Sequence, residues 1–166
     1  MTLGADSTER PALILFCGLP GSGKTTVARE RAREAGAIRF STDEWMADLG
    51  VDYFDEIRDR VQARLDDLWK ELLEHGQSVL LEDGTWKRDE RDALRRVAAR
   101  LGASTELHYF DIPIDDLWRR LDLRNANPTY GSAPISRNLL DECLTRFERP
   151  DDAELLLFDR CVVHRS

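Results

Sequence analysis

The sequence has no excess of positive charge. It contains 24 Lys and Arg residues against 32 Asp and Glu residues, which gives a formal net charge of -8 and an isoelectric point near 5.0. Proteins that bind long polyanions do so with clustered Lys and Arg side chains. The composition therefore disfavours nucleic acid as a partner, although it leaves room for a local basic pocket.

Cysteine and histidine are scarce. The three cysteines are odd in number and have no C-x-x-C spacing, so they predict neither a disulfide framework nor a zinc site. The three histidines stand singly, without metal-ligand spacing or a serine partner, and we assign them no chemistry. These residues are Cys17, Cys143, Cys161, His75, His108 and His164.

Long apolar runs are absent as well. The first eleven residues lack the apolar core of a signal peptide, and no later run is long enough to cross a bilayer. We therefore expect a cytoplasmic protein with no membrane contact. Its 166 residues, 42% of them hydrophobic, suffice for one compact core. We expect a loose polar tail at residues 1–11 and a single domain at residues 12–166.

The sequence does contain a regular alternation of strand-like and helix-like segments. Strands are predicted at residues 12–17, 37–41, 78–82, 105–110 and 155–158. Helices are predicted at residues 24–35, 43–75 with a break near 50–52, 89–101, 114–124 and 136–147. This order indicates an α/β fold with a parallel sheet covered by helices on both faces. The loop-rich stretch 125–134 is a candidate for a mobile lid.

The strongest motif follows the first predicted strand. Residues 18–25 match G-x-x-x-x-G-K-[ST] at every fixed position, between a strand and a helix. Such a loop wraps backbone amides around phosphate, and its Lys24 reaches the β- and γ-phosphates while the Thr25 hydroxyl binds Mg²⁺. The motif therefore predicts a site for ATP and Mg²⁺. The residues expected to bind them are Gly18, Gly21, Ser22, Gly23, Lys24, Thr25 and Thr26.

Two acids follow the second and third predicted strands. Asp43 and Asp83 are expected at the carboxyl edge of the sheet, where ligands of open α/β sheets bind. Asp43 is a candidate general base for an attacking hydroxyl, but it is also a good helix cap. Asp83 could hold water on Mg²⁺, bind the acceptor or pair with an arginine. Trp45 is a candidate wall of the acceptor site, although aromatic residues more often fill the core.

An arginine-rich segment precedes the proposed lid. Arg120 and Arg124 are four residues apart, so a helix places them on one face, where they suit a phosphate clamp. Arg119 and Arg120 also stand four residues after Asp115 and Asp116, and could form ordinary surface pairs with them. Position 128 is proline, so the spacing that pairs Arg119 and Arg120 with acids does not account for Arg124. Arg124 is therefore the better candidate.

Four segments in order resemble the small P-loop kinases that include bacteriophage polynucleotide kinase: GLPGSGKTT, FSTDEW, LLEDGTW and YFDIPIDDLWRRLDLRN. Chloramphenicol phosphotransferases and zeta toxins are more distant relatives. The resemblance runs from Leu13 to Glu148. It implies a nucleoside-monophosphate-kinase-like, five-stranded P-loop NTPase fold with a helical lid at about 114–135. It also implies Asp43 as general base, Arg120 and Arg124 as the lid arginine pair, and Asp83 at the acceptor site.

One departure from that family concerns the acceptor. Polynucleotide kinase has basic residues around its acceptor acid, whereas Asp43 is followed here by Glu44, Trp45 and Met46. This favours a small, uncharged or cationic acceptor. The leading hypothesis is an ATP-dependent kinase that phosphorylates a hydroxyl of a small molecule or nucleoside-type acceptor. The alternatives are a polynucleotide 5′-hydroxyl kinase and a slow ATPase that regulates a partner. No sequence feature specifies the oligomeric state or a preference for ATP over GTP.

Overall fold

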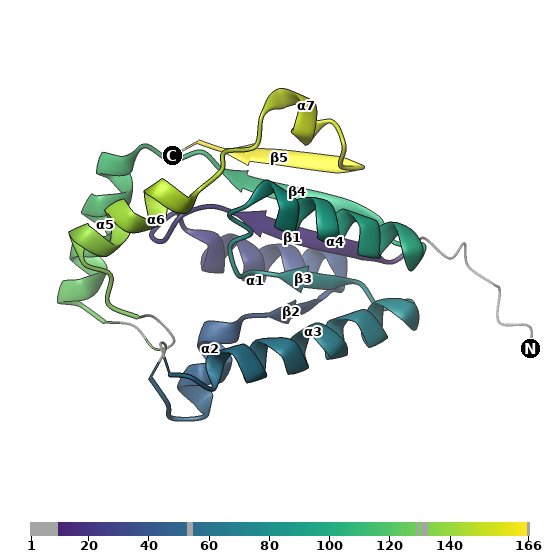
Figure 1. The fold of residues 1–166 in the computed structure, drawn as a ribbon, viewed down its shortest axis with the longest axis horizontal. Helices are drawn as coiled ribbons and strands as arrows, with labels where there is room; N and C mark the ends of the chain where they lie inside the picture. Colours follow the sequence, from purple (N-terminus) through teal and green to yellow (C-terminus); the bar gives the residue numbers. More distant parts are fainter. Residues whose placement is uncertain (1–9, 53–54, 129, 131–132, 166) are drawn as a thin grey trace, which may run out of the picture.

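The computed structural model describes residues 10–52, 55–128, 130 and 133–165. Its centre is a five-stranded, fully parallel sheet with the order β2-β3-β1-β4-β5. All strand arrows in Figure 1 point to one edge of the sheet, where α2, α5 and α6 lie. The strands are β1 (Ala12–Cys17), β2 (Ile38–Phe40), β3 (Val79–Leu81), β4 (Ser104–Phe110) and β5 (Arg160–His164).

Helices cover both faces of the sheet (Figure 1). One core contains residues of α3 and α4 packed on β1, β3 and β4, and the other contains residues of α1, α5 and α6 packed on the opposite face. Among the described residues, no helix is both long and apolar enough to span a membrane. The helices are α1 (Lys24–Ala35), α2 (Thr42–Asp48), α3 (Arg58–Glu74), α4 (Arg88–Arg100), α5 (Ile114–Ala126), α6 (Arg137–Arg146) and α7 (Asp152–Leu155).

The structure confirms most of the predicted elements. The predicted break in the second helical segment separates α2 from α3, and Gly50 occupies it with a φ of 68°. The expected tail at 1–11 lies mainly outside the described residues. At its end, the Pro11 carbonyl accepts a hydrogen bond from the Ser104 amide at 2.9 Å. This bond attaches Pro11 to the start of β4.

The predicted final strand at residues 155–158 is wrong. Helix α7 ends at Leu155, residues 156–157 form a turn, and the last strand is β5, which begins at Arg160. The Asp151 side chain accepts a hydrogen bond from the Glu154 amide at 2.7 Å, and this cap starts the helix. Leu156 is 85% exposed, so the apolar run does not mark a buried strand.

A buried carboxylate on β4 ties α1 to the sheet. Glu106 accepts hydrogen bonds from Arg31 Nε and from His108 Nε2, both at 2.6 Å. Burial alone would raise the pKa of Glu106, but the hydrogen bonds from His108 and Arg31 outweigh it and lower this pKa to about 2. The ionised form of Glu106 therefore stabilises the folded chain.

The contribution of ionised Glu106 to the stability of the fold depends on pH. The ordinary pKa of the group is 4.5 and its folded pKa is about 2. Its stabilisation is therefore complete above about pH 5 and is lost as the pH falls toward 2, by roughly 2–3 kcal/mol. We expect the difference in unfolding free energy between wild type and Glu106→Gln to shrink over this range. Urea unfolding at successive pH values measures it, and a constant difference would contradict the assignment.

Candidate active site

The loop between β1 and α1 depends on glycine. Gly21 and Gly23 have φ values of 81° and 88°, in the left-handed region that other residues rarely adopt. A Cβ at Gly21 would also lie 2.8 Å from Cγ of Leu121 on α5. The loop thus packs under α5 and presents the N-terminus of α1 at the carboxyl edge of the sheet. A helix N-terminus of this kind favours phosphate.

The side chain of Lys24 folds over this loop. Its Nζ donates hydrogen bonds to the carbonyl oxygens of Gly18 at 3.0 Å and Leu19 at 2.8 Å. It also lies 3.4 Å from the hydroxyl of the buried Ser22. Thr26 is exposed in the first turn of α1. The residues predicted to bind phosphate are therefore gathered in one loop and one helical turn.

Three acidic side chains lie close enough to Lys24 to affect its pKa. Burial lowers the pKa of Lys24 to about 8, while the charges of Glu82, Asp43 and Asp83 act in the opposite direction. Because these acids follow β2 and β3, the neighbouring strands bring them to the same edge as the loop after β1. The structure thus brings together Lys24, Asp43 and Asp83, as the sequence predicts.

Glu82 is a site residue that the sequence analysis missed. It follows β3 directly, its side chain is only 8% exposed, and it accepts a hydrogen bond from the Thr25 hydroxyl. It also forms an ion pair with Arg39. A neighbouring hydroxyl and carboxylate are the oxygen donors that Mg²⁺ prefers. The signal in the sequence was the position of Glu82, which ends an apolar strand one residue before the acid that we singled out.

Glu82 also begins a chain of ion pairs that runs to α2. Arg39 on β2 pairs with both Glu82 and Glu44, and Glu44 in turn pairs with Arg29 of α1 at 2.8 Å. The side chain of Arg39 is only 17% exposed, which shields its two ion pairs from solvent. The chain therefore links Thr25, at the phosphate loop, to the helix that carries Asp43.

Asp43 lies in the first turn of α2 and is not the helix cap. Ser41 is the cap, since its side chain accepts a hydrogen bond from the Glu44 amide. Asp43 instead pairs with Arg58 Nη1 at 2.8 Å, and its side chain remains 46% exposed. The capping alternative for Asp43 is thus removed. A half-exposed carboxylate at this edge can reach a bound hydroxyl.

The side chain of Asp83 contacts Thr42, the first residue of α2. Its carboxylate accepts hydrogen bonds from the Thr42 amide at 3.0 Å and from the Thr42 hydroxyl. Burial raises the pKa of Asp83, while the two bonds from Thr42 oppose that rise. Asp83 therefore helps to fix the N-terminus of α2, and in this structure it is Glu82 that contacts Thr25.

The two predicted lid arginines differ in their surroundings. Arg120 Nη1 lies 3.9 Å from the position that a Cβ of Gly23 would take, so it borders the phosphate loop. Arg124 Nη2 donates to the Ala133 carbonyl at 3.1 Å and so holds the segment after α5. Arg119 is 69% exposed and pairs with Asp116 at 2.7 Å, as an ordinary surface residue. Arg120 thus lies beside the loop expected to hold the phosphates.

Trp45 does not line the pocket described next. It is 46% exposed on α2. Trp86 supports the phosphate loop instead, because its indole Nε1 donates to the Gly18 carbonyl at 3.1 Å. A Cβ at Gly84 would lie only 2.8 Å from the same carbonyl. The segment after β3 is therefore packed directly against the loop.

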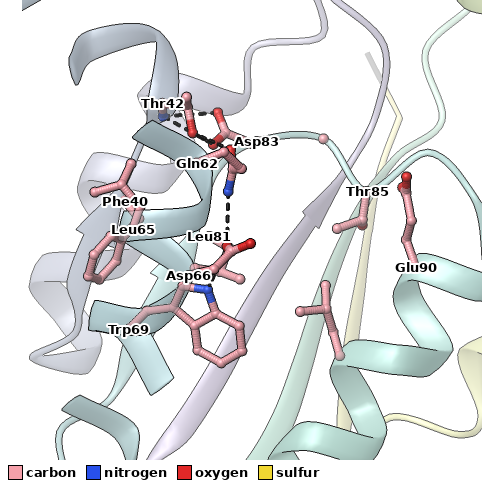
Figure 2. Close-up of a pocket in the computed structure, with 12 residues that line it drawn as sticks. Phe40, Thr42, Gln62, Leu65, Asp66, Trp69, Leu81, Asp83, Thr85 and Glu90 are labelled. Carbon is pink, nitrogen blue, oxygen red and sulfur yellow. Dashed lines mark hydrogen bonds between the residues drawn. The ribbon is translucent and has the colours of Figure 1, made fainter. Parts of the chain in front are cut away.

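A cavity of about 310 Å³, here called the α3–α4 pocket, opens between α3, α4 and the ends of β2 and β3 (Figure 2). Phe40, Leu65, Trp69, Leu81 and Leu94 form its apolar part. Its polar lining consists of Thr42, Gln62, Asp66, Asp83, Thr85 and Glu90. Asp83 and Thr42 belong both to this pocket and to the edge that carries Lys24. The pocket is thus continuous with the candidate site.

Comparison with known proteins identifies the family of this chain and solved structures with the same fold. A family model described as an AAA domain matches residues 13–150. The bifunctional enzyme NodQ of Azospirillum brasilense is 33% identical over 119 residues, which cover 68% of this chain. The chain spans only 19% of the length of that relative.

Solved structures show the same fold. A sugar kinase from Janibacter sp. superposes with a TM-score of 0.61 at 20% identity, covering 95% of this chain and 86% of that one. A chain of the Pnkp1/Rnl/Hen1 RNA repair complex gives a TM-score of 0.69 at 20% identity, covering 87% of this chain and 46% of that one. These likenesses confirm the predicted α/β fold of the P-loop kinase type.

Proposed function

Because the chain belongs to the AAA domain family and has the fold of P-loop kinases, we propose that it transfers the γ-phosphoryl group of ATP to a hydroxyl group. The acceptor in this proposal is a small molecule or a nucleoside-type compound. One observation carries it: the Thr25 hydroxyl beside Lys24 donates a hydrogen bond to Glu82, and the next residue, Asp83, accepts one from Thr42, which precedes Asp43. A phosphate donor site and acids able to serve an acceptor thus share one edge of the sheet.

The proposed reaction is an in-line displacement. A bond forms between the acceptor oxygen and the γ-phosphorus, the bond to the β–γ bridging oxygen breaks, and ADP leaves. Asp43 accepts the proton of the attacking hydroxyl. Lys24 and the N-terminus of α1 hold the phosphates, and Arg120 stabilises the charge that develops on the transferring group. Arg124 acts beside it in this proposal.

The residues present also suit Mg²⁺. The Thr25 hydroxyl and the Glu82 carboxylate would hold the ion, and Asp83 could act through water. When bound, Mg²⁺ neutralises charge on the β- and γ-phosphate oxygens. Arg39 supports this arrangement because its ion pair fixes the orientation of the Glu82 carboxylate.

A transfer assay tests the proposal. Wild-type protein is incubated with γ-labelled ATP, Mg²⁺ and a panel of nucleosides, sugars, amino sugars, phenicols, nucleotide sugars and 5′-hydroxyl oligonucleotides. We expect label to move to one small-molecule or nucleoside class. Lys24→Met should lower the rate about 100- to 1,000-fold, because a preorganised electrostatic contact to the phosphates is lost.

Other outcomes favour the alternatives. Label that moves only to oligonucleotide 5′ ends would replace the small-molecule reading with a polynucleotide kinase. Slow release of phosphate that no acceptor changes would favour an ATPase that regulates a partner. Either result would overturn the proposed acceptor class, and the second would overturn the kinase assignment itself.

A further inference from the structure

The α3–α4 pocket has the place and size of an acceptor site. Its volume of about 310 Å³ falls at the lower end of the range for small-molecule pockets. Asp83 and Thr42 lie at the edge that also carries Lys24, and Gly84, another lining residue, packs against Gly18 of the phosphate loop. A molecule in this pocket would therefore sit next to the phosphate donor. It would also lie beside Asp43, the proposed base, which follows Thr42 in the chain.

The charges in the pocket are all negative. Asp66, Asp83 and Glu90 line it, and among its described lining residues there is no Lys, Arg or His. The guanidinium of Arg91 reaches the pocket only at the Thr85 carbonyl, to which it donates a hydrogen bond at 3.0 Å, and its charge is paired with the buried Glu154. Arg58 acts on Asp83 but is ion-paired with Asp43. A phosphorylated or carboxylated acceptor would therefore meet repulsion inside the pocket.

Asp66 has the most specific geometry. Gln62 Nε2 and Trp69 Nε1 both donate to the same oxygen, Oδ1, at 3.0 Å. Figure 2 shows the other oxygen turned into the space that faces Thr85 and Glu90. The two neighbouring donors fix the direction of this carboxylate. Its second oxygen is thus presented to whatever occupies the pocket.

The rest of the lining suits a ring or short carbon skeleton. Phe40, Leu81 and Leu94 give apolar contact. The Thr42 hydroxyl shares its proton between Gln62 and Asp83 but can still accept a hydrogen bond, and the Gln62 amide has a second N–H besides the one given to Asp66. An apolar floor with a few fixed polar groups is typical of small-molecule sites. Neutral sugars would satisfy this part of the lining. They would leave the carboxylates without a cation.

We propose that the α3–α4 pocket selects an acceptor that carries a protonated amine as well as the hydroxyl to be phosphorylated, namely an amino sugar or amino alcohol. Asp66 binds the ammonium group, and the hydroxyl faces Asp43. The apolar floor packs against the carbon skeleton. This inference rests on the proposed kinase function and names its substrate class.

A matched set of acceptors tests it. Glucosamine, glucose and gluconate have similar size but carry positive, no and negative charge, and an aminoglycoside adds a larger amine. We expect kcat/KM for phosphoryl transfer to be at least about tenfold higher for an amine than for its neutral or acidic counterpart, because a charge-assisted hydrogen bond is gained. Equal or better transfer to the neutral or acidic acceptor would overturn the inference.

Two variants on the same helix locate the effect. Asp66→Asn keeps an oxygen for Gln62 and Trp69 but removes the charge, and should raise KM for the amine about tenfold or more. Asp67→Asn makes the same change at an exposed position outside the pocket lining and serves as the control. The affinity for ATP reports that both variants are folded. Equal KM values for both variants would overturn the assignment of Asp66.

Calorimetric binding separates this inference from the kinase proposal. If no acceptor is phosphorylated but the amines bind to wild type and Asp67→Asn, and more weakly to Asp66→Asn, the kinase function fails and the cationic pocket stands. If amines bind no better than glucose, the pocket inference fails whether or not transfer occurs.

Discussion

Replacement of Asp43 by Asn should lower phosphoryl transfer by about 100- to 10,000-fold, the usual effect of removing a general base. The amide keeps the size of the side chain but cannot accept the proton of an attacking hydroxyl. The affinity for ATP should change little, because Lys24 and the N-terminus of α1, not Asp43, are the groups proposed to hold the phosphates. Transfer from γ-labelled ATP and binding of a fluorescent ATP analogue measure the two effects separately.

The fold should tolerate this change. The ion pair between Asp43 and Arg58 is partly exposed, and such pairs contribute less than about 1 kcal/mol. Asp59→Asn is the matched control, since Asp59 is an exposed acid in the first turn of α3. It should retain wild-type transfer. If Asp43→Asn and Asp59→Asn transfer phosphate equally well, Asp43 is not the base.

Replacement of Glu154 by Leu should destabilise the fold by about 3–5 kcal/mol, the largest effect on stability that we expect from one substitution. The side chains of Arg91 and Glu154 are 0% and 1% exposed, and their two contacts are 2.5 and 3.0 Å long. Removal of the carboxylate would leave the guanidinium buried with hydrogen bonds only to the Thr85 and Trp86 carbonyls and the Cys17 sulfur. Urea unfolding followed by circular dichroism measures the loss.

A double variant separates pairing from packing. Arg91→Met combined with Glu154→Leu removes both charges and should recover much of the stability, because the stranded charge is what destabilises the single variant. Asp141→Asn breaks an exposed pair with Arg137 and should change the unfolding free energy by less than about 1 kcal/mol. A double variant as unstable as Glu154→Leu alone would show that shape, not charge, explains the loss.

Local patterns predicted most of this fold and the donor half of the site. The phosphate loop is recognisable because its glycines, lysine and threonine must occur at fixed spacing between a strand and a helix. Four strands were placed within about a residue, and two of them, β1 and β3, are the continuous apolar runs that buried parallel strands form. Asp43 and Asp83 were found by their position after strands, which topology brings to one edge.

The missed features depend on contacts that are distant in sequence. Nothing local distinguishes Glu82 from Asp83, because only the packing of β3 beside β1 turns Glu82 toward Thr25. The final strand was misplaced because Leu155–Phe158 is apolar, whereas the Asp151 cap and the buried Glu154 form a short helix that ends at Leu155 and is followed by a turn. Nothing in the local sequence marks Arg91 as buried, because its partner lies 63 positions away.

The hydrogen bond from Thr25 to Glu82, together with the ion pairs of Arg39 with Glu82 and Glu44, has a thermodynamic consequence. They connect the residues proposed to bind the phosphates and the metal with α2, which carries the proposed base. A ligand that draws the Glu82 carboxylate away from Arg39 changes the stability of this connection, and therefore the free energy of holding α2 in place. Linkage then requires reciprocity: whatever factor Mg·ATP applies to acceptor affinity, the acceptor must apply to the affinity for Mg·ATP. The site proposed for Mg·ATP and the site proposed for the acceptor are in this sense one binding unit.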